Sequence, residues 1–180
     1  MSKLYTQLDE KLQAFILKQK LFFVGTADRE GRVNVSPKGL DSLRIIDANR
    51  IAWLNLTGSG NETAAHVLEI PRMTLMFCSM EGDPMILRAY GTARMIQSRD
   101  DEWAEWKDLF PEYPGSRQIF LLDVDLVQTS CGFAVPLFEY VGDRDDLIYW
   151  TNKIGDDGVI KYWEKNNVKS LDGKPTKIFE

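Results

Sequence analysis

Residues 53–66 read Trp53-Leu54-Asn55-Leu56-Thr57-Gly58-Ser59-Gly60-Asn61-Glu62-Thr63-Ala64-Ala65-His66, and this stretch decides the fold. An apolar, strand-like run ends in a loop of small polar residues, and a helical pattern follows. Ser59 and Glu62 have the Ser-x-x-Glu spacing of a capping box, which predicts a capped helix start. Such a start has unpaired N–H groups and the positive end of the helix dipole, so it can hold phosphate. No Gly-Lys-Ser/Thr follows, which excludes a Walker A loop, and a capped helix with nothing bound remains the alternative.

The composition is that of one soluble globular protein. The chain has 180 residues, enough for a sizeable core, and its net charge of −5 argues against a nucleic-acid partner held on a basic surface. No apolar run reaches the roughly 20 residues of a membrane helix, and the N-terminus lacks a signal peptide's apolar core. Cys78 and Cys131 fit two reduced thiols in a cytoplasmic protein, and with one histidine they make no metal-ligand cluster.

The segment before residues 53–66 alternates in polarity. One face of the expected strand is polar and the other is largely apolar: Arg32, Asn34, Ser36 and Lys38 against Val33, Val35 and Pro37. A polar face of this kind ordinarily meets water, but it could equally line a site. In the strand expected at 85–94, Arg88 likewise projects away from the apolar layer, toward solvent, an interface or a ligand.

Several strands at short spacing, joined by hairpin turns and flanked by helices, predict an α+β, mainly β fold built on an antiparallel sheet. Long strands after short turns favour a barrel, which removes exposed edges. Helical periodicity predicts helices at about 4–18 and 156–166. We expect a single domain over 1–180, with a core at about 20–127 and a C-terminal extension at about 128–180. Residues 130–136 are small and apolar, which suits a buried loop, and the apolar tail is suited to packing against a second subunit.

Taken together, the chain resembles the pyridoxamine 5′-phosphate oxidase-like superfamily, the flavin-binding split barrels. The matching pieces follow one another in order over about 20–127: residues 34–39, residues 53–63, the short helix ending at Pro71-Arg72, residues 73–77 and residues 86–91. The tail, through residues 130–136 and 170–173, resembles a bacterial branch of that superfamily. The resemblance implies a six-stranded antiparallel split β-barrel with flanking helices, and a homodimer that binds FMN at the subunit interface.

In that family, two adjoining strands and the following loop hold the phosphate and ribityl chain of FMN. Carried over by position, the first strand contributes Ser36, Pro37, Lys38 and Gly39. The second strand and its loop contribute Asn55, Thr57, Ser59, Gly60, Asn61, Glu62 and Thr63. A dianionic phosphate also requires a cation, which Lys38 or Arg88 could supply.

Two departures from the family pattern bear on the substrate. Vitamin B6 oxidases of this family have an Arg-Lys pair at the loop positions that Glu62 and Thr63 occupy here. They also hold their substrate with an Arg and a His near the C-terminus, whereas the only histidine here is His66, which we expect on the surface of the short helix. Pyridoxamine phosphate is therefore not the substrate that we expect.

The leading hypothesis is an FMN-dependent oxidoreductase that acts on an unidentified small molecule, with no general acid or base assigned. The alternative is a non-catalytic FMN-binding carrier or sensor, because no pair of titratable residues has acid–base spacing. A third hypothesis keeps the barrel and replaces the cofactor with deazaflavin or haem.

Overall fold

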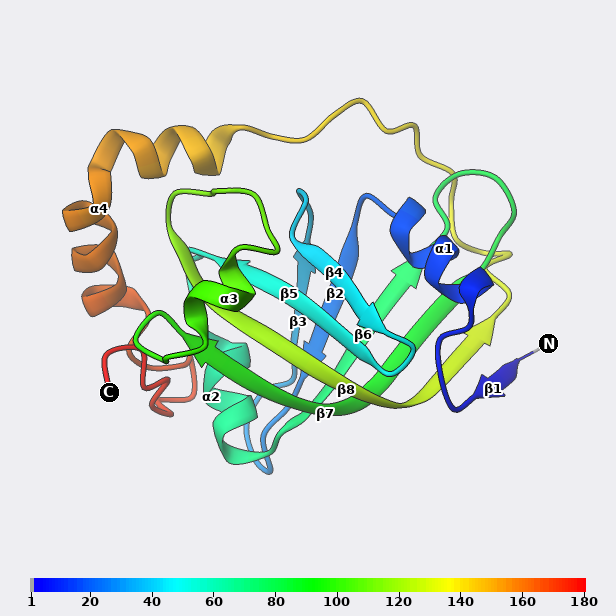
Figure 1. Cartoon of the computed structure of the whole chain (residues 1–180), viewed down its shortest axis with the longest axis horizontal. Coiled ribbons are helices and arrows are strands. Elements are labelled where there is room, and N and C mark those ends of the chain that lie inside the picture. The colour runs from blue at the N-terminus through cyan, green and yellow to red at the C-terminus, as the bar shows by residue number, and fades with distance from the viewer. Residues whose placement is uncertain (1) are drawn as a thin grey trace.

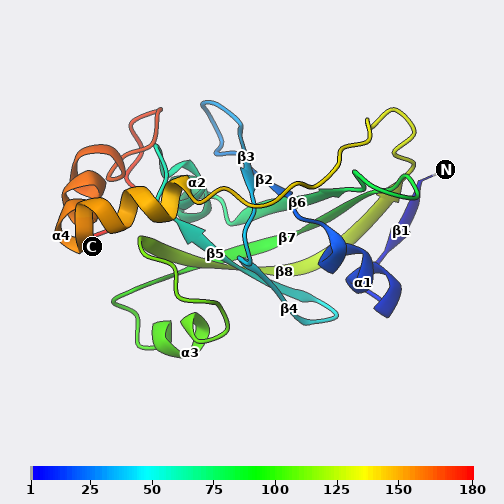
Figure 2. The same ribbon diagram turned by 90° about the horizontal axis from the view of Figure 1, so that it is seen from above.

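The computed structural model describes residues 2–180, and its centre is one strongly curved antiparallel sheet (Figures 1 and 2). The strands are β1 (Lys3–Tyr5), β2 (Phe22–Thr26), β3 (Asn34–Lys38), β4 (Leu43–Asp47), β5 (Arg50–Leu56), β6 (Arg72–Cys78), β7 (Ile86–Gln97) and β8 (Ser116–Ser130). The helices are α1 (Glu10–Lys18), α2 (Glu62–Glu69), α3 (Trp103–Lys107) and α4 (Asp146–Asn166).

The order of the strands explains how the sheet curls into a barrel. Neighbours run β3-β2-β6-β7-β8-β5-β4, and β1 pairs with β8. The two ends of this path, β3 and β4, follow each other in the sequence and are separated only by residues 39–42. So short a connection forces the two ends of the sheet together. They meet without pairing to each other, which is the arrangement of a split barrel.

The predicted antiparallel split barrel is confirmed, but the sheet has eight strands where six were expected. One of the additional strands, β1, overlaps the start of the helix that was predicted at 4–18. Asp9 caps α1 by accepting a hydrogen bond from the Leu12 N–H at 2.9 Å, so the helix begins only at Glu10. The residues before this cap are extended, and β1 pairs with β8.

Alternation along the strands builds the core. In β2, Phe22, Val24 and Thr26 are buried. Trp53 of β5 is fully buried and stacks on Phe120 of β8, with ring centroids 4.7 Å apart. β5 and β8 pair residue by residue from Arg50 opposite Asp123 to Asn55 opposite Gln118, and burial on both strands locks this register. The register then shifts, so that Leu56 faces Ser116.

Gly91 of β7 lies opposite a bulge in β8: Tyr90 pairs with Leu126 and Gly91 with Val124, which leaves Asp125 as the extra residue. A Cβ at Gly91 would lie 1.9 Å from the backbone oxygen of Asp123. Only glycine allows the two backbones to come this close.

After β8 the chain leaves the barrel. Residues 131–145 cross the molecule as an extended segment and lead into α4, as both ribbon views show (Figures 1 and 2). Gly155, with a φ of 66°, kinks α4, which is longer than the predicted helix 156–166.

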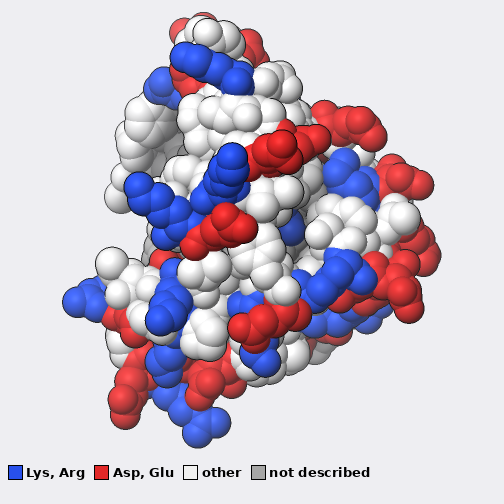
Figure 3. Space-filling model, turned by 90° about the vertical axis from the view of Figure 1, so that its left-hand side faces the viewer, with Lys and Arg blue, Asp and Glu red and all other residues white. Residues whose placement is uncertain are grey.

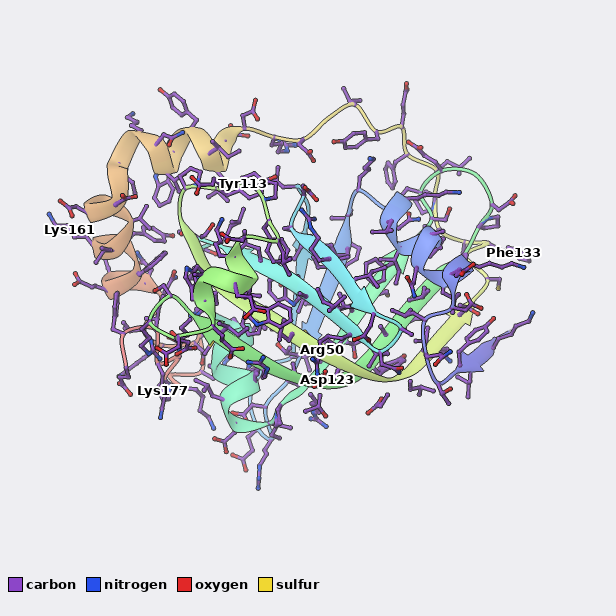
Figure 4. All side chains as sticks on the ribbon, in the orientation of Figure 1. Arg50, Tyr113, Asp123, Phe133, Lys161 and Lys177 are labelled. Carbon is purple, nitrogen blue, oxygen red and sulfur yellow. The ribbon has the colours of Figure 1, made fainter. Side chains whose placement is uncertain are left out.

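The prediction that residues 130–136 form a buried loop is wrong. Gly132 packs against the backbone of Met85, but Phe133 is 82% exposed and projects away from the ribbon (Figure 4). Small apolar residues do not by themselves show whether a loop is covered, because that depends on what packs over it.

Both cysteines are free, Cys78 buried and Cys131 exposed. None of the helices within residues 2–180 has the length and apolarity to cross a bilayer.

Candidate functional site

The edge strand β3 is oriented opposite to the ordinary arrangement. Its polar side chains Asn34, Ser36 and Lys38 are partly buried, whereas Val33 and Val35 are 72% and 62% exposed. Solvent-facing apolar residues and inward-facing polar residues both cost free energy, so this orientation needs a compensating interaction. Of the two readings that the sequence left open, the structure favours a strand that lines a site.

The inward face of β3 borders a cavity of about 930 Å³. Small-molecule sites typically measure roughly 300–1,000 Å³, so this cavity lies at the upper end of that range. It brings together all but one of the residues predicted for the site: Ser36, Pro37, Lys38, Gly39, Asn55, Thr57, Ser59, Gly60, Asn61, Glu62 and Thr63. Arg88 is not among the lining residues, and its Nη1 lies 3.4 Å from the hydroxyl of Ser130.

Lys38 is the cation that β3 contributes to the cavity. Its Nζ donates to the Oδ1 of Asn55 at 3.4 Å and lies 5.2 Å from the centre of the Trp53 ring. Burial, and after it the positive charge of Arg117, lowers the pKa of the Lys38 amine to about 8. Within residues 2–180, Lys38 forms no ion pair.

Arg117 of β8 is a second cation in the cavity wall, and sequence reasoning missed it. It is only 4% exposed, and burial lowers the pKa of its guanidinium to about 9, which leaves it charged at neutral pH. Its Nη1 donates to the Gly60 carbonyl at 3.0 Å and to the Oδ1 of Asn167 at 2.6 Å. Neither acceptor is a carboxylate. The available signal was a charged residue two positions before the apolar run Ile119–Leu122 in the buried first half of the strand.

The cavity also receives the N-terminus of α2. The expected capping box of Ser59 and Glu62 is wrong, because Asn61 is the N-cap residue and Glu62 is the first residue of the helix. The Glu62 carboxylate instead accepts from the Leu171 N–H at 2.9 Å, a partner 109 residues away that no local pattern could indicate. The Asn61 side chain caps nothing, so the first N–H groups of α2 lack a capping side chain.

Several buried polar atoms around this cavity have no hydrogen-bond partner within residues 2–180. Four belong to residues that line the cavity: the Ser36 Oγ, both polar atoms of the Asn61 side chain and the Arg117 Nε. A fifth, the Gln118 Nε2, belongs to the residue after Arg117 in β8. Buried polar groups are normally paired, so a cluster of orphaned atoms needs an explanation. An anion with several oxygen atoms, placed between Lys38, Arg117 and the start of α2, would bring acceptor atoms to the part of the wall where these unpaired groups lie.

His66 is not the surface residue that we expected. It is 2% exposed, and its Nδ1 is hydrogen-bonded to the Thr26 hydroxyl at 3.1 Å. α2 packs this face onto β2, which the isolated helix pattern could not reveal. His66 does not line the cavity, so it is not a ligand for a haem bound there.

The surface around the site has no single sign of charge. Acidic and basic side chains alternate over the face that carries α4 (Figure 3). The concentration of positive charge is therefore a property of the cavity interior, not of a surface patch that could attract a polyanion.

The order of the strands and the cavity beside β3 define a split-barrel protein. The family model for pyridoxamine 5′-phosphate oxidase matches residues 8–131, and the chain belongs to this family. The chain is similar to the pyridoxamine 5′-phosphate oxidase family protein UstO of Aspergillus flavus, with 35% identity over 95% of this chain and 76% of that protein.

Two solved structures share the fold. HupZ from Group A Streptococcus has a TM-score of 0.52 and 20% identity, over 66% of this chain and 90% of that chain. A FAD-binding protein from Mesorhizobium loti has a TM-score of 0.50 and 8% identity, over 72% of this chain and 97% of that chain.

The lowered pKa of Lys38 predicts how stability changes with pH. Since the folded-state pKa is about 8 and the ordinary value is 10.5, the unfolded chain binds more protons between these values. The contribution of Lys38 to the free energy of unfolding should therefore rise with pH across this window. Urea denaturation of the ligand-free protein from pH 7 to 10.5 should show this rise, and Lys38→Met should make it smaller, leaving the part above about pH 9 that the lowered pKa of Arg117 contributes. Identical pH profiles for the two proteins would contradict the burial of a charged Lys38.

Proposed function

We propose that this protein binds FMN in the cavity and uses it as an oxidoreductase on a small molecule. The observation that carries the proposal is a pair of cations, the partly buried Lys38 and the buried Arg117, which have no carboxylate partner within residues 2–180 and line the same cavity as the uncapped start of α2. A phosphate monoester supplies the charge and the acceptor atoms that these groups lack.

The phosphate would be held by three elements. Lys38 and Ser36 extend from β3, Arg117 from β8, and the free N–H groups from the start of α2. The carboxylate of Glu62 also lines the cavity, and the hydrogen bond from the Leu171 N–H offsets part of its repulsion of an anion. In this proposed site the cations extend from the barrel strands β3 and β8. In vitamin B6 oxidases of the family, the Arg-Lys pair is instead in the loop.

The remaining wall of the cavity suits an aromatic ring system. Leu21, Leu54, Leu56 and Leu147 contribute apolar surface, which excludes water from a bound ring. FMN, when bound, supplies hydride and electron transfer at its isoalloxazine ring. The FAD-binding protein of similar fold supports a flavin as the ligand of this type of barrel.

The direct test is to purify the protein, release its ligand and identify it by mass spectrometry. We expect FMN and a yellow protein. Bound FMN should be reduced by a nicotinamide cofactor and reoxidised by an added acceptor. If FMN binds but never turns over with any donor, the protein is a carrier or sensor. A colourless protein that takes up no added FMN, or a released deazaflavin or haem, would overturn the proposal.

Two substitutions test the phosphate position. Lys38→Ala removes a cation, and Thr63→Glu adds a carboxylate close to the start of α2. Each should weaken FMN binding by about 1–3 kcal/mol, the scale of a charge-assisted hydrogen bond. Titration with quenching of flavin fluorescence measures the affinity.

Arg50→Ala is the matched control, because Arg50 pairs with Asp123 at 2.6 Å on the surface (Figure 4). It removes the same unit of charge away from the cavity and should leave FMN affinity unchanged. Full affinity in both Lys38→Ala and Thr63→Glu would mean that the phosphate binds elsewhere.

We further propose that two copies form a homodimer across the outward face of β3. Val33 and Val35 are exposed there, and Val33 also borders the cavity. A partner that covered this face would bury apolar surface and help to close the site.

Light scattering should show a dimer for the wild type and a monomer for Val35→Lys, because a charge would be buried in the interface. Leu109→Lys is the control. Leu109 is 42% exposed just after α3, which lies on the opposite side of the barrel from β3 (Figure 2). A monomeric wild type, or a dimer that persists in Val35→Lys, would contradict this interface.

A further inference from the structure

The C-terminal extension is hydrogen-bonded to the loop that borders the cavity. The Trp163 Nε1 donates to the Thr57 hydroxyl at 2.9 Å, and the Asn167 Nδ2 donates to the Gly58 carbonyl at 3.1 Å. Both contacts join residues more than 100 positions apart. The family match ends at residue 131, so these contacts come from a part of the chain beyond it.

Asn167 is the centre of these contacts. Its side chain uses both of its polar atoms: the amide nitrogen donates to the loop, and the Oδ1 accepts from the Arg117 guanidinium at 2.6 Å. The residue is fully buried, and its own carbonyl accepts from the Thr176 hydroxyl at 2.6 Å. The amide is therefore fixed in orientation from two sides, and it fixes Arg117 and the loop relative to each other.

The partner of the Arg117 guanidinium is the side-chain amide of Asn167, which carries no charge. A carboxylate at position 167 would pair with Arg117 and cancel its charge. An amide oxygen orients the guanidinium and leaves the charge uncompensated within the cavity wall. The Arg117 Nε is buried without a partner among residues 2–180, which is the second sign that the guanidinium is not satisfied by the protein alone.

We infer that Asn167 is a positioning residue that reserves the Arg117 charge for the phosphate of the ligand, so that the C-terminal extension determines the preference for a phosphorylated flavin. This inference rests on the proposed function. It assigns to residues outside the family match a role in choosing FMN over riboflavin, which differ only by the phosphate.

The test is Asn167→Asp, which keeps the shape of the side chain and gives Arg117 a carboxylate partner. Affinities for FMN and for riboflavin are measured by fluorescence titration, and inorganic phosphate is tested by its protection against thermal unfolding. We expect the ratio of FMN to riboflavin affinity to fall about tenfold, the effect of losing a charge-assisted contact. Riboflavin affinity should be nearly unchanged, and phosphate should no longer protect.

Asn166→Asp is the matched control. It makes the same change one residue earlier, where the Asn166 Nδ2 donates to the Tyr162 carbonyl and does not contact Arg117. The control should keep the wild-type ratio. A merely structural role for Asn167 would instead weaken both ligands alike in Asn167→Asp and leave the ratio unaltered, which would overturn the inference.

The remaining outcomes separate this inference from the proposed function. If the wild type binds FMN and riboflavin equally, flavin binding stands and the inference fails. If it binds phosphate but no flavin, and Asn167→Asp abolishes phosphate protection, the proposed function fails and the role of Asn167 in anion binding stands. If it binds neither, both fail. If Asn167→Asp does not fold, Arg117→Met replaces it, and a wild-type preference for FMN in that variant overturns the inference.

Discussion

The structure depends on the short connection between β3 and β4. These strands occupy the two ends of the sheet, yet only residues 39–42 separate them. The sheet must therefore close on itself, and closure turns one face of β3 inward. It also brings Lys38 within 3.4 Å of Asn55 on β5, although β3 and β5 are far apart in the order of strands. The cavity forms because closure of the sheet turns the inner face of its edge strand β3 toward the barrel interior instead of toward solvent.

Charge gives this cavity its chemical character. Burying a cation without a counter-ion is costly, and Lys38 and Arg117 are both held this way next to the start of a helix. Natural proteins keep such unsatisfied arrangements mainly at functional sites. In the proposed site, folding has already oriented the hydrogen-bond donors before the ligand arrives. Binding an anion therefore costs little further ordering of the protein.

The C-terminal extension completes the wall of the cavity. Its Leu171 N–H donates a hydrogen bond to the carboxylate of Glu62, one of the residues that line the cavity. It further anchors the barrel through Lys174, whose Nζ pairs with Asp28 at 3.0 Å, and through Asp172, which pairs with Arg32. The same segment thus holds the edge beside β3 and the loop before α2. A protein of this family with a different extension would have a different cavity even if its barrel were identical.

The sequence by itself determined the antiparallel sheet and the loop at 57–63, because alternation and turn chemistry are local properties. The resemblance to the family, also carried by the sequence, placed all but one of the predicted site residues at the cavity. Only the tertiary structure decided which face of β3 points inward, that His66 is buried, and that Asn61 begins α2. It also revealed Arg117 in the cavity wall, where its guanidinium is hydrogen-bonded to Asn167, 50 residues further along the chain. Periodicity shows which side chains share a face. It does not show what that face will meet, since the closure of the sheet and the path of the tail are set by contacts between distant segments.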